Sequence, residues 1–214
     1  MKVEIPLSFG RIRGHGIRWP LKFLYTSNIP VILIAALLAN IQLFARLLEN
    51  AGRPWFGTFS GNQPISGLVL WVFPPQLTDS IITGAFRLID LGHAFVYMLI
   101  MIVGAVVFSY FWVQTACMDA SSQARQIMAS GLQIPGFRRD ERVLEQILKR
   151  YITPLTIMGG FTIGFLSGAA DLMGALTSGT SLLLAVMIIY NLYETIAQQH
   201  MVDMYPALRK VIEK

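Results

Sequence analysis

Long apolar stretches alternate with polar connections along this chain. They predict helices at residues 27–48, 92–117, 151–176 and 180–198. A helix of roughly 20 mostly apolar residues crosses the hydrocarbon core of a bilayer, which is about 30 Å thick. The pattern therefore predicts an all-α membrane protein with four transmembrane helices.

The first connection, residues 49–91, is long and weakly charged. Its apolar piece from Ser66 to Pro75 is too short to cross, which predicts a re-entrant or interfacial segment. Apolar residues at helical spacing in 78–91 predict a helix lying along the membrane surface. By contrast, the turn at 174–179 is tight, so we expect the last two spans to form an antiparallel hairpin.

Basic residues set the expected orientation, because cytoplasmic loops retain Lys and Arg. Residues 1–26 hold five Lys or Arg against one acidic residue, and residues 118–150 hold six. We therefore expect 1–26 and 118–150 to be cytoplasmic basic loops, 199–214 to be a cytoplasmic tail, and 49–91 to be external. No cleavable signal peptide is visible near the start of the sequence.

Composition agrees with a bilayer location. Hydrophobic residues make up 54% of the chain against 14% charged, and the mean hydropathy is +0.56, which excludes a single soluble domain. The net charge of +5 favours lipid headgroups or an acidic cytoplasmic partner, because the basic residues flank apolar runs. The single cysteine, Cys117, excludes an intrachain disulfide.

Two features inside the spans have open interpretations. Gly160, Gly164 and Gly168 repeat every fourth residue, which indicates either close helix packing or a pore-facing wall. Asn40 shares a helix face with aliphatic residues such as Ile29, and it is either an interhelical hydrogen-bonding group or a polar point on a seam that opens.

Catalysis is not expected. The segment from Gly164 to Gly168 has one residue too many for the Gly-x-Ser-Gly of a membrane serine protease, and Asp171 has no partner carboxylate for aspartyl protease chemistry. His15, His93 and His200 lie in three separate regions, so no metal site and no cofactor are predicted.

Several segments in order carry a resemblance to a known family. The sequence resembles the C-terminal half of SecY, the protein-conducting channel subunit, in its archaeal and eukaryotic-like form, from the seventh to the tenth transmembrane segment. The matching segments, spread over essentially the whole chain, are 17–22, 25–42, 64–75, 136–138, 149–154 and 179–184.

The resemblance implies roles for individual residues. Ile29, Ile32 and Leu184 match the aliphatic pore ring, a dry constriction that resists ions yet deforms around a peptide. Asn40 matches the polar position of the lateral gate. Four arginines match loops that dock a ribosome or cytosolic motor: Arg138 and Arg139 in the second cytoplasmic loop, and Arg11 and Arg13 in the first.

The resemblance also implies partners. The first six segments of the family, with the plug and the opposite wall of the gate, are not in this sequence, so we expect the chain to need the N-terminal half of SecY. A SecE-type single-span subunit, a small beta- or SecG-type subunit, a nascent polypeptide with its signal sequence, and membrane lipid complete the expected partners. Opening is expected to be a passive, hinge-like separation of the two halves in the cell membrane.

Two other function classes stay open at this stage. Half of a secondary transporter for a small solute would use Asp171, Asn191 and Glu194 as coupling groups. Both carboxylates lie near span ends, which weakens that alternative. A purely structural membrane subunit would use Ile29, Ile32 and Leu184 for assembly only.

Overall fold

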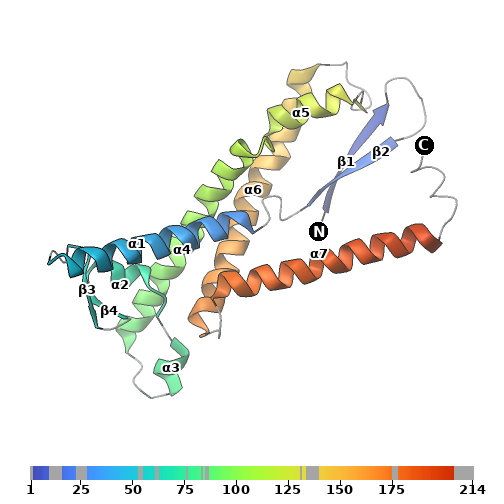
Figure 1. Ribbon diagram of the computed structural model, residues 1–214. Coiled ribbons are helices and arrows are strands. Elements are labelled where there is room, and N and C mark those ends of the chain that lie inside the picture. The colour runs from blue at the N-terminus through green and yellow to red at the C-terminus, as the bar shows by residue number, and fades with distance from the viewer. Residues whose placement is uncertain are drawn as a thin grey trace.

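The fold was analysed in a computed structural model (Figure 1). The structure describes residues 2–9, 16–22, 28–52, 55–60, 63–75, 77–82, 84, 87–130, 132–133, 140–174 and 178–204. The described part is mostly helical, and four of its helices are long and apolar enough to cross a membrane. The predicted fold class, an all-α membrane protein with four spans, is confirmed.

The elements follow one another along the chain with five short strands among seven helices in the described residues. The helices are α1 (Ile29–Asn50), α2 (Leu68–Val72), α3 (Leu77–Ile82), α4 (Leu88–Thr115), α5 (Ala120–Ala129), α6 (Glu141–Leu172) and α7 (Gly179–Met204). The strands are β1 (Lys2–Phe9), β2 (Gly16–Lys22), β3 (Thr58–Ser60), β4 (Gln63–Ser66) and β5 (Leu132–Gln133).

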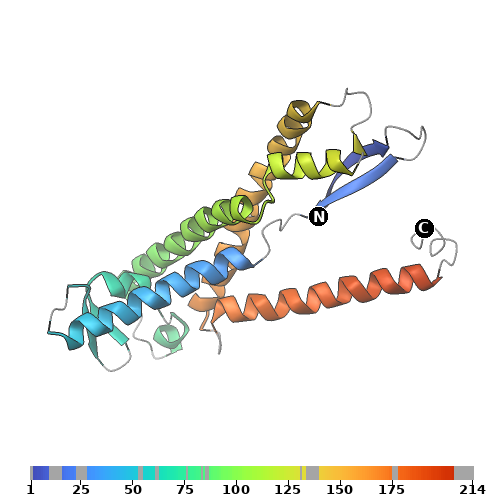
Figure 2. The ribbon, with the colours of Figure 1, turned by 45° about the horizontal axis from the view of Figure 1, so that its top comes forward.

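Helices α4 and α6 form the most extensive contact of the molecule, lying against each other over much of their length (Figures 1 and 2). Buried glycines of α6 face α4 along this contact. A Cβ added at Gly164 would lie 2.9 Å from the Cβ of Ala105 and 3.1 Å from the Cα of Ile102. Of the two interpretations of the glycine repeat, close helix packing is therefore the observed one.

Helix α1 packs across α4 on another face of that helix. Ile34, Leu38, Tyr97 and Met101 form a buried cluster between the two helices. Gly104 of α4 lies so close to Ile34 that a Cβ there would overlap the isoleucine side chain. Van der Waals contact thus joins α1 to the α4–α6 pair. This is usual in membranes, where lipid is as apolar as the side chains and the hydrophobic effect does not drive helices together.

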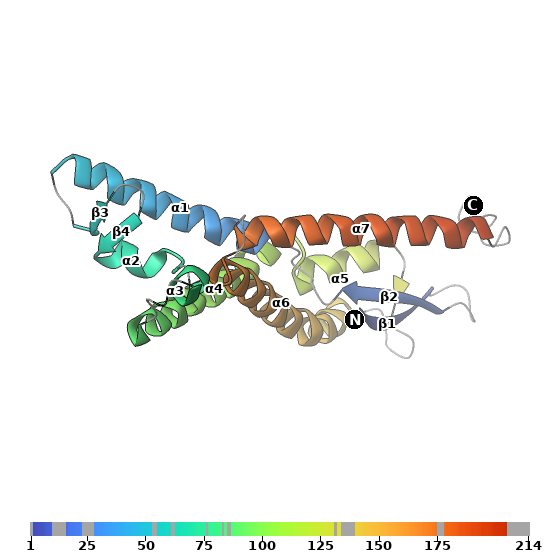
Figure 3. The same cartoon turned by 90° about the horizontal axis from the view of Figure 1, so that it is seen from below.

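Helix α7 starts beside the end of α6 and then diverges from it, as the views agree (Figures 1–3). None of the apolar window of α7 is buried. The expected antiparallel hairpin of the last two spans is thus open, with contact confined to its base.

The base of α7 is fixed by the carboxylate of Asp171 near the end of α6. Asp171 Oδ1 accepts a hydrogen bond from the backbone N–H of Gly179 at 2.6 Å, and Oδ2 accepts one from the Tyr97 hydroxyl of α4 at 2.9 Å. Nearby, the Thr78 hydroxyl donates to the carbonyl of Met173 at 2.7 Å, which ties α3 to the same corner. One carboxylate therefore connects three helices.

The segment expected as a plain basic loop at 1–26 instead contains an antiparallel hairpin of β1 and β2. The register places Val3 opposite Leu21 and Ile5 opposite Trp19. On its other edge β1 pairs with β5, with Ser8 opposite Gln133 and Phe9 opposite Leu132, so the sheet order is β2-β1-β5. Strands formed because apolar residues alternate with polar ones or proline in both segments, a period of two that is typical of strands.

The connection expected at 118–150 is also more ordered than a loop. It contains α5 and the first ten residues of α6, a helix that begins at Glu141 and continues into the span expected at 151–176. Asp119 caps α5 by accepting from the N–H of Ser122. Buried apolar residues of α4, α5 and α6 form a cluster there: Val113, Ala124, Ile127, Leu144, Leu148, Ile152 and Leu155.

The described residues of 49–91, the segment expected to be external, fold against the ends of the spans. Helix α2 is far too short to span a membrane. Its Val69 side chain is fully buried, and Trp71 packs edge-on against the His93 ring of α4. The single surface helix expected over 78–91 is wrong. Gly84, with φ +68°, follows the end of α3, and α4 begins at Leu88. A glycine in the left-handed region commonly ends a helix.

Replacing Gly164 with alanine should destabilise the helix frame. The new methyl group meets Ala105 and the backbone of Ile102, so α4 and α6 must move apart, at a cost of about 1–3 kcal/mol. Thermal unfolding of the purified protein in detergent, followed by circular dichroism, would measure the loss. Gly92→Ala is the matched control because a Cβ at Gly92 meets nothing within 4 Å. Equal melting temperatures for the two variants would contradict the packing argument.

Replacing Asp171 with alanine should release the base of α7. Two donors lose their acceptor, and unsatisfied buried groups cost about 1–3 kcal/mol each. Hydrogen–deuterium exchange at the start of α7 should therefore accelerate. Asp171→Asn keeps an acceptor oxygen and should show a smaller change. An exchange rate unaffected by Asp171→Ala would refute the anchoring role of this carboxylate.

Candidate functional site

The first turns of α1 and α7 meet beside the α4–α6 pair, and this is where the predicted pore residues lie. The side-chain N–H of Asn28, just before α1, donates to the carbonyl of Leu183 at 3.4 Å. Leu183 also packs against the buried cluster of Val31, Ala105 and Ile163. Segments 155 residues apart in sequence are thereby held together.

The three predicted ring residues adjoin this contact. Ile29 follows Asn28 directly, Leu184 follows Leu183, and both side chains are half-buried. Ile32 is 38% exposed. The side chains are aliphatic and keep exposed surface next to a buried cluster, as the wall of an opening would. Their role in a pore stays a prediction.

Sequence reasoning did not single out Asn28. Its Oδ1 is buried without a hydrogen-bond partner among the described residues, while its amide bonds to α7. The available signal was an asparagine immediately before an apolar run whose second residue is Pro30, a frequent pattern at helix starts. Here the side chain bonds to another helix instead of capping its own.

Asn40 lies on the exposed face of α1, together with Leu33 and Ala36. Its side-chain amide donates to the carbonyl of Ala36 at 2.8 Å, one turn earlier in the same helix. Within the described part of the chain Asn40 bonds to no other helix. The face predicted for the lateral gate is thus uncovered in this chain, and the gate role itself stays a prediction.

The predicted docking arginines, Arg11, Arg13, Arg138 and Arg139, lie outside the described residues. The strands that lead to them are described, and they pair. Phe9 of β1 lies opposite Leu132 of β5. The two basic segments therefore follow neighbouring strands of the same sheet.

The residues of the transporter alternative do not form one site around Asp171. That carboxylate bonds to Tyr97 and Gly179, which gives it a role in holding helices together. Asn191 is exposed on α7, and its carbonyl accepts from the Thr195 hydroxyl. Glu194 is half-buried on the same helix.

Comparison with known proteins matches the chain to one family. The SecY family model matches residues 1–193. Protein translocase subunit SecY of Pyrococcus furiosus is 46% identical over 99% of this chain and 44% of its own length. That of Methanocaldococcus jannaschii is 43% identical over all of this chain and 48% of its own.

Solved structures agree. One described as the structure of a protein conducting channel has a TM-score of 0.74 and 43% identity, over 97% of this chain and 46% of that one. Sec61 in a canine ribosome–channel complex from the endoplasmic reticulum has a TM-score of 0.69 and 42% identity, with the same coverage of both chains. These relatives are channel proteins, which argues against the small-solute transporter.

The chain thus spans about half the length of the curated relatives that it matches. The family match covers most of the sequence, and the structural similarity extends over 97% of the chain. The chain belongs to the SecY family.

Proposed function

We propose that this chain forms the C-terminal half of the central subunit of a Sec-type protein-conducting channel. Such a channel passes secreted polypeptides across the cell membrane and releases transmembrane segments into lipid through a lateral gate. The likeness over 97% of the chain to a protein-conducting channel carries this proposal. The arrangement of α1 and α7 gives it a physical basis.

The uncovered helices support a requirement for the other half. Large exposed apolar side chains occur along α1 and α7, including Leu37 at 44%, Leu47 at 55% and Ile188 at 60%. Lipid can cover some of them, but a diverging helix such as α7 lacks the van der Waals partners that hold membrane helices together. An N-terminal SecY half would supply them, with SecE-type and small beta- or SecG-type subunits around it.

The pore ring would come from Ile29, Ile32 and Leu184, with matching residues from the other half. Branched aliphatic side chains give a constriction without hydrogen-bonding groups, so water and ions gain nothing by entering. The same side chains change rotamer easily and accept polypeptides of any sequence. The ring would seal and stretch without chemistry, and we propose that the chain carries no catalytic step.

The exposed face of α1 would form this half's wall of the lateral gate. Asn40 satisfies its amide within its own helix, so the face can part from a neighbour without leaving that donor unpaired. Separation of the halves would then expose a path from the pore to lipid for apolar segments.

The driving force would come from a ribosome or cytosolic motor docked on the basic loops. Arg11 and Arg13 follow β1, while Arg138 and Arg139 follow β5, and the two strands pair. A common sheet would let both loops act as one docking unit. We infer that both ends of the chain lie in the cytoplasm and 49–91 outside, because the distribution of basic residues favours that orientation.

A cysteine at Ile32 or at Leu184 should cross-link to a polypeptide arrested in the complete channel. The exposed native Cys117 is first replaced by serine, so that only the introduced thiol reacts. Phe165→Cys is the control, because Phe165 is 47% exposed on α6 and is not assigned to the pore. The yield of cross-linked product on a gel measures the outcome. Equal yields at Ile32 and Phe165 would count against the ring.

Charge reversal of the docking loop should weaken partner binding. Arg138→Glu with Arg139→Glu replaces attraction by repulsion, and we expect at least about a tenfold loss in affinity, or roughly 1.4 kcal/mol. Co-sedimentation of the complete channel with ribosomes would measure it, at low and high salt. Arg125→Gln, at an exposed pair with Glu141, is the control. If the double variant bound ribosomes with unchanged affinity, these arginines would serve only to set the orientation of the chain in the membrane.

A further inference from the structure

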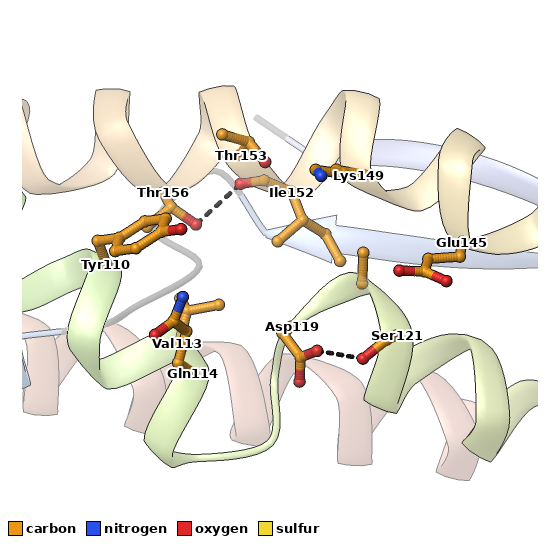
Figure 4. A pocket seen from close by; sticks show the side chains of 11 residues that line it. Tyr110, Val113, Gln114, Asp119, Ser121, Glu145, Lys149, Ile152, Thr153 and Thr156 are labelled. Atoms are coloured by element: carbon orange, nitrogen blue, oxygen red, sulfur yellow. Dashed lines mark hydrogen bonds between the residues drawn. The ribbon is translucent and has the colours of Figure 1, made fainter.

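A cavity with both polar and apolar lining residues lies where α4 ends and α5 begins, beside the early turns of α6 (Figure 4). Its volume is about 210 Å³. Tyr110 and Gln114 of α4 and Glu145 and Lys149 of α6 line it, with Asp119 at the start of α5. Figure 4 shows these side chains reaching toward one another from the end of α4, the start of α5 and the early turns of α6.

The cavity contains both positive and negative side chains, and two of the three form no hydrogen bond or ion pair with other described residues. Neither Lys149 nor Glu145 has a hydrogen-bond or ion-pair partner among the described residues. Asp119 accepts from the Ser121 hydroxyl at 2.5 Å and the Ser122 N–H at 3.4 Å, and these hydrogen bonds lower its pKa, so it is ionised at neutral pH. The cavity therefore presents one ammonium and two carboxylates.

The cavity lies at the end of the apolar part of the α4–α6 pair. Its apolar side is made by Val113 and Ile152, which are almost fully buried. From Tyr110 into the span, the exposed residues of α4 are apolar, including Val107 and Val103. From Thr153 into the span, α6 likewise exposes Ile157 and Phe161. Charged groups at one end and exposed apolar side chains beyond them match the two parts of a membrane lipid.

We propose that this cavity binds the headgroup of a zwitterionic aminophospholipid from the cytoplasmic leaflet. Lys149 pairs with the phosphate, to which the Tyr110 hydroxyl and the Gln114 amide can donate. Glu145 and Asp119 receive the ammonium group. The acyl chains lie along the exposed apolar side chains of α4 and α6.

The charges argue for this class over the others that share a phosphate. A free phosphate or an anionic phospholipid could pair with Lys149, but it brings no cation for Glu145 and Asp119, and their negative charges would repel it. A zwitterion satisfies both signs at once. The proposal rests on the membrane placement of α4 and α6 and on the orientation given under the proposed function, but it stands or falls separately from the pore and the docking loops.

Native mass spectrometry of the complete, delipidated channel would test this site. The probes are phosphatidylethanolamine, phosphatidylglycerol and water-soluble phosphoethanolamine. Phosphatidylethanolamine should bind in preference to phosphatidylglycerol. Lys149→Gln should reduce retention of phosphatidylethanolamine about three- to tenfold, as expected for a partly exposed charge-assisted hydrogen bond. Glu145→Gln should reduce the preference over phosphatidylglycerol by a similar factor.

Matched controls come from the neighbouring exposed pair of Arg125 and Glu141, 3.0 Å apart and outside the cavity. Arg125→Gln and Glu141→Gln remove the same charges and should leave lipid retention unchanged. Tyr110→Phe, which removes only a hydroxyl, should show a smaller loss than Lys149→Gln. Unchanged retention in Lys149→Gln would overturn the proposal, as would equal affinity for the two lipids. Displacement of the lipid by phosphoethanolamine at equal concentration would indicate a soluble phosphate ligand and overturn it too.

Discussion

The close backbone contact between α4 and α6 is the constraint on which the rest of this structure depends. Lipid is as apolar as the side chains, so burial of apolar surface gives little reason for these helices to associate. Gly160 and Gly164 let the two backbones approach closely, and the many small van der Waals attractions between their atoms together stabilise the pair. Helix α1 then packs on α4 across the similarly tight step at Gly104. Three helices thus form a frame through their own contacts.

Helix α7 is attached to this frame at its base only. The Asp171 carboxylate and the Asn28 amide hold its first residues, and the rest of the helix leaves the frame. The polar bonds are strong where water is scarce, so the attachment is firm at one end and free at the other. Most of α7 can therefore change its position relative to α1 without repacking the frame.

The four spans were predictable because each is a long apolar run. The glycine repeat of α6 left close packing and a pore-facing wall open, and the short Cβ distances to α4 decide for packing. The hairpin was missed, although Val3, Ile5 and Leu7 alternate with polar residues or proline as in a strand. Basic residues dominated that prediction, and charge says nothing about which strands pair across 125 residues of sequence, as Ser8 and Gln133 do. The break after α3 was missed because the helical spacing of 78–91 continues through Gly84, and only backbone geometry reveals the stop.

In the candidate site, too, the sequence identified individual residues but not the contacts between residues far apart in the chain. A resemblance in sequence singled out Ile29 and Leu184, but only the fold shows that their neighbours Asn28 and Leu183 bond to each other. Aliphatic side chains cannot fix their own position by hydrogen bonds, so the polar contact next to them sets the spacing of the two helices. The proposed ring would have to yield to any polypeptide, which requires deformable side chains on a fixed backbone. In this half the backbone is fixed by one amide, one carboxylate and the glycine contact, all of them outside the three side chains assigned to the ring.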